Sequence, residues 1–269
     1  MDRDTRLAAQ RCLDAGAAAV VIEVCDAQGS APRGAGTRML VTPQAAFGTV
    51  GGGHLELKAI ATAREMLRTG ELAPRREHYP LGPALGQCCG GAVTLSSSRL
   101  DADALSRWPV PAPLFHLQLY GAGHVGRAIA TLLATLDVVV DWIDERDEEF
   151  PADTVFGTPW PAHIRSVCVD AVEAEVSGAP AGAFYLVLTH RHDLDLRIAE
   201  AILRRGDFGF LGLIGSKTKR QRFAHRFEER GLAPALVARM VCPIGVEGIT
   251  GKQPEVIAAA VVAQLLQRP

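Results

Sequence analysis

Two adjacent cysteines, Cys88 and Cys89, are the residues whose type and setting most clearly suggest chemistry. They lie in the segment GQCCGG, where glycines flank the pair. Adjacent cysteines cannot readily chelate one tetrahedral ion together, and a disulfide between neighbours needs strained backbone. Paired thiols in a glycine-rich loop are instead suited to present one thiolate to a soft metal or a sulfur centre. The alternative is a pair of small buried side chains, since free cysteine is commonly buried.

The glycines of the segment GAGHVG have the spacing of a phosphate-binding turn. The segment follows a predicted strand at 115–120 and precedes a predicted amphipathic helix at 124–136. In such a turn Gly121 permits the tight bend, Gly123 lets the backbone approach a phosphate, and Gly126 lets helix and strand pack closely. The free N–H groups of the helix would add positive potential. The alternative is a glycine turn that serves packing alone.

Asp144 adds to the nucleotide-binding pattern of this turn. It ends the next predicted strand, 23 residues after Gly121, where ribose hydroxyls would be bound. Arg146 stands close enough to contact an added phosphate instead. A nucleotide or pterin-phosphate pocket is therefore favoured, and the sequence does not fix which.

A second anion site is suggested by the segment GLIGSKTKR. Ser216 is expected to cap a helix whose first turn carries Lys217, Lys219 and Arg220. A capped helix with a solvated basic face is an equally good interpretation.

The segment THRHD follows another predicted strand. His190 and His192 do not complete a metal shell there, and Asp193 is expected to cap the next helix. His190 is conceivable as a general acid–base group, although the sequence shows no partner for it.

The elements around the cysteine pair predict a small α+β domain over residues 1–107. Short strands interleaved with two helices give this assignment. The helices are expected at 5–15 and 54–68, and the strands at 18–24, 37–42 and 92–97, with a short segment at 76–79.

The segment WPVPAP, residues 108–113, has the composition of a stiff extended spacer. Beyond it, residues 114–269 alternate strands with longer helices and predict a Rossmann-like, doubly wound parallel sheet. The strands are expected at 115–120, 138–143, 166–169, 184–188, 210–214 and 239–242, and the helices at 124–136, 193–205, 217–230 and 254–267.

Composition excludes several classes of protein. The 269 residues hold 28 Lys and Arg against 30 Asp and Glu, so neither a nucleic-acid-binding patch nor an anionic-lipid surface is expected. No apolar stretch is long enough to span a bilayer, and the first dozen residues lack the apolar core of a signal peptide. No C-x-x-C spacing occurs. A cytoplasmic protein with reduced thiols is expected, with its other cysteines, at positions 12, 25, 168 and 242, filling the core.

A series of motifs runs almost end to end along the chain: GSAPRGAGTRMLV, GTVGGGHLE, GQCCGG, LYGAGHVG, the strand end at Asp144, THRHDLDL, GLIGSKTKR and PIGVEGITGKQPEVIA. In these motifs and their order the chain resembles the xanthine dehydrogenase accessory proteins, the XdhC/CoxI family, and within it the XdhC branch. His54 stands where more distant relatives often have cysteine, and the doubled cysteine is typical of the XdhC branch. The segments TGKQPEVIA and THRHD depart mildly from the family pattern, which leaves ligand detail at those loops open.

This resemblance implies a molybdenum-cofactor chaperone rather than an enzyme of small-molecule turnover. Members bind a molybdopterin-type cofactor, shield it while a cysteine desulfurase supplies a terminal sulfido ligand, and pass it to apo-xanthine dehydrogenase. A thiolate of Cys88 or Cys89 would be a sensible holder for the soft molybdenum centre. A homodimer is also expected.

Further cofactor-binding residues are expected on the loops. Arg33, in GSAPRGAG, would add a bidentate phosphate contact or be an exposed loop arginine. Gly52, Gly53 and His54, in GTVGGGH, would shape the pocket with the glycine turn.

Two other functions stay open. One is an NAD(P)-dependent oxidoreductase that uses Gly121, Gly123, Gly126 and Asp144, with His190 as proton donor; it offers no account of GQCCGG. The other is a docking protein for dehydrogenase assembly whose pocket is unused.

Overall fold

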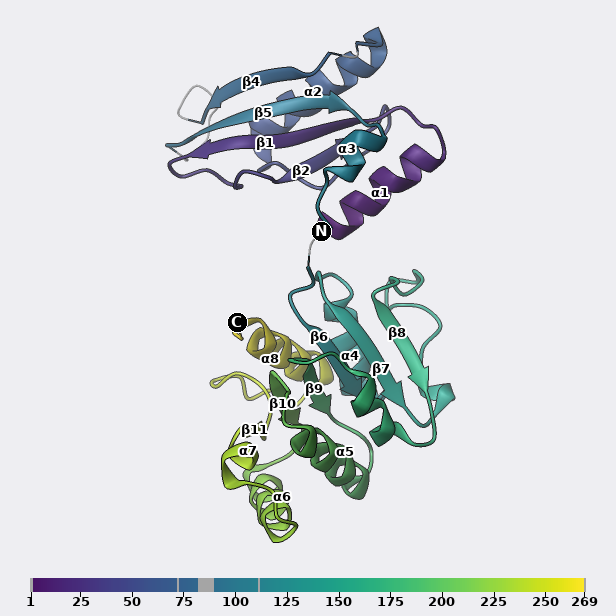
Figure 1. Cartoon of the computed structure of the whole chain (residues 1–269), viewed down its shortest axis with the longest axis vertical. Helices are drawn as coiled ribbons and strands as arrows, with labels where there is room; N and C mark the ends of the chain where they lie inside the picture. The colour runs from purple at the N-terminus through teal and green to yellow at the C-terminus, as the bar shows by residue number, and fades with distance from the viewer. Residues whose placement is uncertain (1, 72, 82–89, 111, 269) are drawn as a thin grey trace. The chain divides into compact units, whose positions relative to one another are not determined.

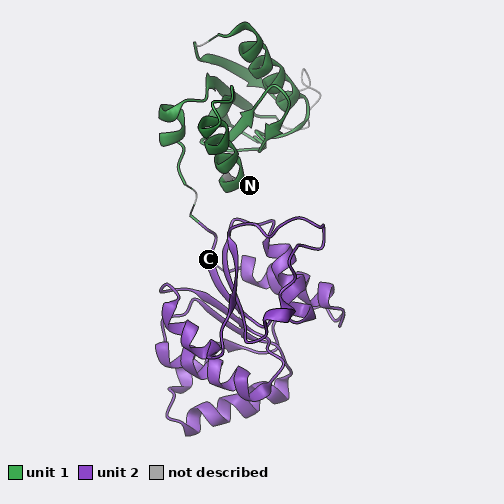
Figure 2. Ribbon diagram, turned by 90° about the vertical axis from the view of Figure 1, so that its right-hand side faces the viewer, with its two compact units in different colours: residues 1–112 green, residues 113–269 purple. Residues whose placement is uncertain are grey.

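The computed structural model describes residues 2–71, 73–81, 90–110 and 112–268 (Figure 1). The chain divides into two compact units, residues 1–112 and 113–269 (Figure 2). Each unit contains one sheet.

The first unit is built on a five-stranded antiparallel sheet in the order β3-β2-β1-β5-β4. Helix α2 packs on one face of this sheet, where it covers Ile22 and Val24, and α1 and α3 pack on the other face, against Val21 and Leu40. Neighbouring residues of β1 therefore enter different cores, as the period of a strand requires. The elements are α1 (Asp2–Asp14), β1 (Val20–Gln28), β2 (Arg38–Val41), β3 (Ala46–Phe47), α2 (Gly53–Thr69), β4 (Arg75–Pro80), β5 (Ala92–Arg99) and α3 (Ala102–Ser106).

Trp108 belongs to the core of the first unit and not to a spacer. Its side chain is 4% exposed among Ala9, Leu40 and Leu105, and its carbonyl accepts a hydrogen bond from Arg6 Nε at 3.1 Å. The predicted spacer from position 108 therefore begins too early. A tryptophan in a proline-rich segment still buries its large ring when a nearby apolar surface is available.

The second unit is a six-stranded parallel sheet in the order β11-β10-β9-β6-β7-β8, which confirms the predicted Rossmann-like fold. Helices α4 and α8 pack on one face, and α5 and α6 on the other. The strands are β6 (His116–Tyr120), β7 (Val139–Asp144), β8 (Ile164–Cys168), β9 (Phe184–Val187), β10 (Phe210–Leu213) and β11 (Met240–Val241). The helices are α4 (His124–Leu133), α5 (His192–Arg205), α6 (Lys217–Glu229), α7 (Pro234–Ala238) and α8 (Pro254–Leu266), with 3-10 turns η2 (Asp147–Glu149) and η3 (Val172–Gly178).

Strand order reverses between β6 and β9. The strands β7 and β8 are added on one side of β6, and β9, β10 and β11 on its other side. Open parallel sheets bind ligands at the carboxyl ends of the strands at such a point. Here the glycine turn follows β6, the THRHD segment follows β9, and the GSK segment follows β10. The topology therefore brings three of the motifs to one edge.

Among the described residues, no helix is both long and apolar enough to cross a membrane.

Candidate functional site

The three glycines of the turn differ in what surrounds them. Gly121 has a φ of +121°, and a Cβ there would lie 2.5 Å from the Leu188 carbonyl oxygen. A Cβ on Gly126 would lie 2.0 Å from the Gly121 oxygen, so a side chain is excluded at both positions. A Cβ on Gly123 would meet nothing within 4 Å. Gly121 and Gly126 thus have packing reasons to be glycine, whereas Gly123 faces open space at the N-terminus of α4.

Two side chains fix the backbone of this turn. The buried Trp142 indole donates from Nε1 to the Gly121 oxygen at 3.0 Å. Arg127 Nε donates to the Ala122 oxygen, also at 3.0 Å. The turn is therefore held in place from both the sheet and the helix.

Asp144 supports the turn and is already fully hydrogen-bonded. Its Oδ2 accepts from the Ala122 amide at 2.7 Å, and both its oxygens accept from the Arg146 guanidinium at 2.9 Å. Burial opposes ionisation, but the hydrogen bonds from Arg146 and Ala122 outweigh it and lower the pKa of Asp144. Arg146 also bonds Glu149 at 3.1 Å. The two groups expected at a ribose or a phosphate are thus paired with each other.

A cavity of about 360 Å³ lies beside the turn. His190 stands at this cavity with Nε2 3.5 Å from Glu145 Oε1, a partner that the sequence pattern does not reveal. The cavity therefore has the glycine turn on one side and the end of β9 on the other. It is lined by Gly123, His124, Val125, Arg146, Glu149, Leu188, Thr189, His190 and Ile214.

The GSK segment forms the predicted cap but not the predicted cluster of free cations. Ser216 Oγ accepts from the Lys219 amide at 3.2 Å, and Lys217 is exposed. Lys219 turns inward and is 6% exposed; its Nζ donates to Asp195 Oδ2 at 2.6 Å and to the Ile214 oxygen at 2.7 Å. Lys219 is therefore a buried structural cation, and its inclusion in a solvent-facing anion site is wrong.

Asp195 joins two of the motif loops. Its Oδ1 accepts from the Thr189 amide at 3.0 Å and the Thr189 hydroxyl at 2.7 Å, while Oδ2 accepts from Lys219. The ends of β9 and β10 are thus tied to one carboxylate. Its position between Leu194 and Leu196, in a helix whose inner face is apolar, is the signal in the sequence that could have identified it.

Asp193 does not cap α5. The helix begins at His192 with Arg191 in the capping position, and Asp193 forms exposed ion pairs with Arg191 and Arg197. The buried carboxylate two residues later makes the bonds to the preceding loop instead.

In the first unit, three glycine-rich segments meet at one end of the sheet. A Cβ on Gly51 would lie 2.4 Å from Pro32 Cγ, and one on Gly29 would lie 3.2 Å from Gly91 Cα. The Leu81 amide donates to the Gly91 oxygen at 2.8 Å, which fixes where the segment between them leaves and re-enters the sheet. Cys88 and Cys89 lie in that segment, outside the described residues.

Glu56 organises the GTVGGGH loop. Its Oε2 accepts from the Thr49 hydroxyl, from the Val50 amide at 3.2 Å and from the Gly52 amide at 3.1 Å. Gly53 begins α2 at a φ of +61°. The loop is therefore held in one conformation. Glu56, which holds it, is not among the predicted site residues.

Two predicted contacts of this region are exposed. Arg33, on the loop whose Gly29 meets Gly91, and His54, in the first turn of α2, are both exposed. The structure thus places Arg33, Gly52, Gly53 and His54 near one end of the first sheet, and Gly121, Gly123, Gly126, Asp144, Ser216 and Lys217 at the carboxyl edge of the second sheet.

The four cysteines expected in the core do not share one environment. Cys242 is buried, whereas Cys12 and Cys25 are half-buried. Cys168 is exposed, so its assignment to the core is wrong: it ends β8, at the edge of the sheet. Loss of some hydration and the carboxylates of Asp147 and Asp144 raise the pKa of its thiol, which disfavours the thiolate.

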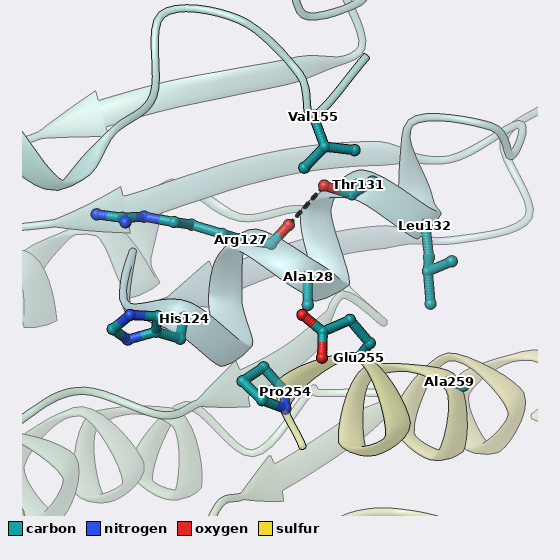
Figure 3. A pocket seen from close by; sticks show the side chains of 9 residues that line it. All are labelled: His124, Arg127, Ala128, Thr131, Leu132, Val155, Pro254, Glu255 and Ala259. Carbon is teal, nitrogen blue, oxygen red and sulfur yellow. Dashed lines mark hydrogen bonds between the residues drawn. The ribbon is translucent and has the colours of Figure 1, made fainter.

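A groove of about 350 Å³ runs between α4 and α8 (Figure 3). Ala128, Leu132 and Ala259 contribute apolar surface, and Val155 approaches from the loop after η2. The charged or polar lining residues are His124, Arg127, Thr131 and Glu255. The groove shares His124 with the glycine-turn cavity. It was not indicated by the sequence, because its wall combines three separate segments.

Models of known families match parts of both units. Residues 117–265 match the XdhC Rossmann domain, and residues 12–80 match the XdhC and CoxI family. The chain belongs to this family, which confirms the resemblance carried by its motifs.

Two individual proteins illustrate the relationship. The Escherichia coli (strain K12) protein described as uncharacterized protein YqeB is 31% identical over 257 residues, which is 91% of this chain and 42% of YqeB. The chain thus spans less than half the length of this curated relative. A crystal structure described as a xanthine dehydrogenase from Bacillus halodurans superposes with a TM-score of 0.76 and 18% identity, over 98% of this chain and 95% of that one. That likeness concerns the fold.

Proposed function

We propose that this protein is a carrier of the molybdenum cofactor. It holds a molybdopterin-type cargo while the terminal sulfur is added and delivers the cargo to an apo-xanthine dehydrogenase. The thiols of Cys88 and Cys89 hold the molybdenum, and a cysteine desulfurase and the molybdenum subunit of the dehydrogenase are the partners. The protein acts as a homodimer in the cytoplasm.

One observation carries this proposal: three glycine-rich loops meet where the cysteine segment joins the sheet. Gly29 approaches Gly91, and Pro32 approaches Gly51, so the loop that holds Arg33 contacts both one end of that segment and the loop that precedes His54. Thiolate is a ligand suited to a soft metal centre, and an exposed arginine suits a phosphate. Contacts made by exposed loop residues also allow the cargo to be released.

The alternative, an NAD(P)-dependent oxidoreductase, needs Asp144 to accept ribose hydroxyls. Both oxygens of Asp144 already accept hydrogen bonds from Arg146. A bound nicotinamide cofactor would have to displace this ion pair, which favours the carrier over the oxidoreductase. In the carrier the cargo phosphate lies at the glycine turn or at the loop of Arg33.

The test is the double variant Cys88→Ala/Cys89→Ala, purified anaerobically from a host supplied with molybdate. We expect its molybdenum and pterin content to fall at least tenfold, with a matching loss of apo-xanthine dehydrogenase activation. Metal analysis and mass spectrometry measure the content.

The matched control is Cys12→Ala/Cys25→Ala, which removes two half-buried thiols from the same unit. It should keep wild-type molybdenum content. Full cargo content and full activation in the Cys88→Ala/Cys89→Ala variant would refute the thiol assignment. Activation of the dehydrogenase by a protein that never holds pterin would identify a docking protein instead.

A further inference from the structure

A second cavity of the Rossmann-like unit is walled by the PIGVEGITGK segment, for which the proposed carrier function gives no role. It has a volume of about 300 Å³ and lies beyond the ends of β10 and β11. Its lining residues come from the end of β10, from the segment 243–251 and from α8.

The loop that walls this cavity is fixed although it has no regular secondary structure. Gln264, on α8, forms two hydrogen bonds with one residue: its Oε1 accepts from the Gly245 amide at 3.0 Å, and its Nε2 donates to the Gly245 oxygen at 3.1 Å. The Ile244 amide donates to the Leu213 oxygen, and the Val246 amide to the Ala260 oxygen, both at 3.2 Å. The cavity is therefore preformed, which lowers the entropic cost of binding.

The wall has the chemistry of a site for a neutral ring. Four isoleucines, at positions 214, 244, 249 and 257, supply apolar surface, and Thr250 supplies a hydroxyl. Among the described residues that line the cavity, none is charged. The amides of residues 244–246 are already paired, so the backbone groups that would pair with ring nitrogens and oxygens are those of residues 249–251. A phosphate would find no cation among these residues.

Ile214 connects this cavity to the glycine-turn cavity, since it lines both. The two cavities therefore adjoin at the Ile214 side chain, along the edge where the parallel strands end. One end has Gly123 and the free amides of α4, and the other has the isoleucine wall. A ligand that fills both ends carries a phosphate and, a short distance away, a neutral heterocycle.

We propose that the cavity under residues 243–251 binds the neutral fused heterocycle, pterin or purine, of a ligand whose phosphate lies at the glycine turn. This inference rests on the proposed function for the location of the cargo phosphate at the turn. Pterin and guanine are both fused rings with an amide edge and an amino group, so the same lining residues could bind either heterocycle.

The test uses neopterin monophosphate, GMP and ribose 5-phosphate as probes in calorimetric titrations of the full chain. Thr250→Trp adds bulk on an exposed loop residue that lines the cavity, and Glu247→Trp adds the same bulk to an exposed residue of the same loop outside the lining. We expect Thr250→Trp to weaken at least one ring-bearing probe tenfold or more, and Glu247→Trp to bind like wild type. Ribose 5-phosphate, which lacks the ring, should bind equally to all three proteins.

A second variant, Ile249→Ala, removes a partly exposed wall residue and should weaken the same probe several-fold. A loss confined to neopterin monophosphate assigns the cavity to pterin, and a loss confined to GMP assigns it to a purine nucleotide. Wild-type affinity for both probes in Thr250→Trp and Ile249→Ala would overturn the inference.

The carrier proposal is tested separately by molybdenum content in Cys88→Ala/Cys89→Ala. A protein whose thiols are dispensable but whose Thr250→Trp variant loses ring binding keeps the ring site and refutes the thiol assignment. The reverse result refutes the ring site alone.

Discussion

At the scale of single residues, Gly123 and Gly126 lie three positions apart and yet have opposite constraints. A Cβ on Gly126 would collide with the Gly121 oxygen, whereas Gly123 has an ordinary φ of −70° and open space where a Cβ would stand. Gly126 has to be glycine for the turn to fold, whereas a side chain at Gly123 would affect only a ligand that binds at the N-terminus of α4. Substitution can therefore separate the two roles.

We expect Gly123→Ala to fold like wild type and to bind neopterin monophosphate at least tenfold more weakly, because its methyl group occupies the space for the phosphate. Thermal unfolding and calorimetry measure the two effects. Gly178→Ala is the matched control, since Gly178 is equally open but lies at the end of η3. Gly126→Ala should lower the melting temperature markedly. Unchanged phosphate binding by Gly123→Ala would show that the turn serves packing alone.

At the scale of elements, the Asp195–Lys219 ion pair connects β9 and α5 with β10 and α6. The partners are 1% and 5% exposed as side chains, and 24 residues separate them in the chain. Sequence spacing predicted the glycine turn well, because its geometry is local. Sequence spacing could not predict this ion pair, because the two charges come together only when α5 and α6 pack on the same face of the sheet.

We expect Lys219→Met to destabilise the protein by about 3–5 kcal/mol, because it leaves a buried carboxylate without its cation. Asp195→Asn/Lys219→Met should cost less than Lys219→Met alone, since the amide oxygen that replaces the carboxylate still accepts from Thr189 and no charge remains buried. Urea unfolding of both variants measures the difference. A double variant less stable than the single one would show that the charge pair itself stabilises the loops.

The difference between local geometry and contacts that form only on tertiary packing also explains other differences between prediction and structure. Glu56 was unremarkable in the sequence, because its partners Thr49, Val50 and Gly52 reach it only after the loop turns back on α2. Lys219 was expected in solvent from its neighbours Lys217 and Arg220, but its position in α6 points it to the core. The prolines that follow Trp108 predict a spacer, but the Trp108 ring packs on α1.

At the scale of the whole molecule, each buried cluster of apolar residues stays within one unit. Two clusters contain residues no later than Trp108, and the other two contain residues no earlier than Phe115. Both units thus have cores of their own, as independent domains do.

We expect a fragment of residues 113–269 to fold alone and to melt cooperatively within a few degrees of one transition of the full chain. Circular dichroism and scanning calorimetry check this. A fragment of residues 1–112 should keep its β-sheet signal in the same way. An unfolded 113–269 fragment would show that its core needs the first unit.

The ion pair between Asp144 and Arg146 has a consequence for ligand choice at the glycine turn. Rossmann-like folds bind nicotinamide dinucleotides through an acidic residue that accepts hydrogen bonds from the ribose hydroxyls. Arg146 occupies the acceptor that such dinucleotides use, and it does so from only two residues away. A ligand that needs this carboxylate has to displace a guanidinium of the same chain, whereas a ligand that binds the turn amides alone leaves the ion pair intact.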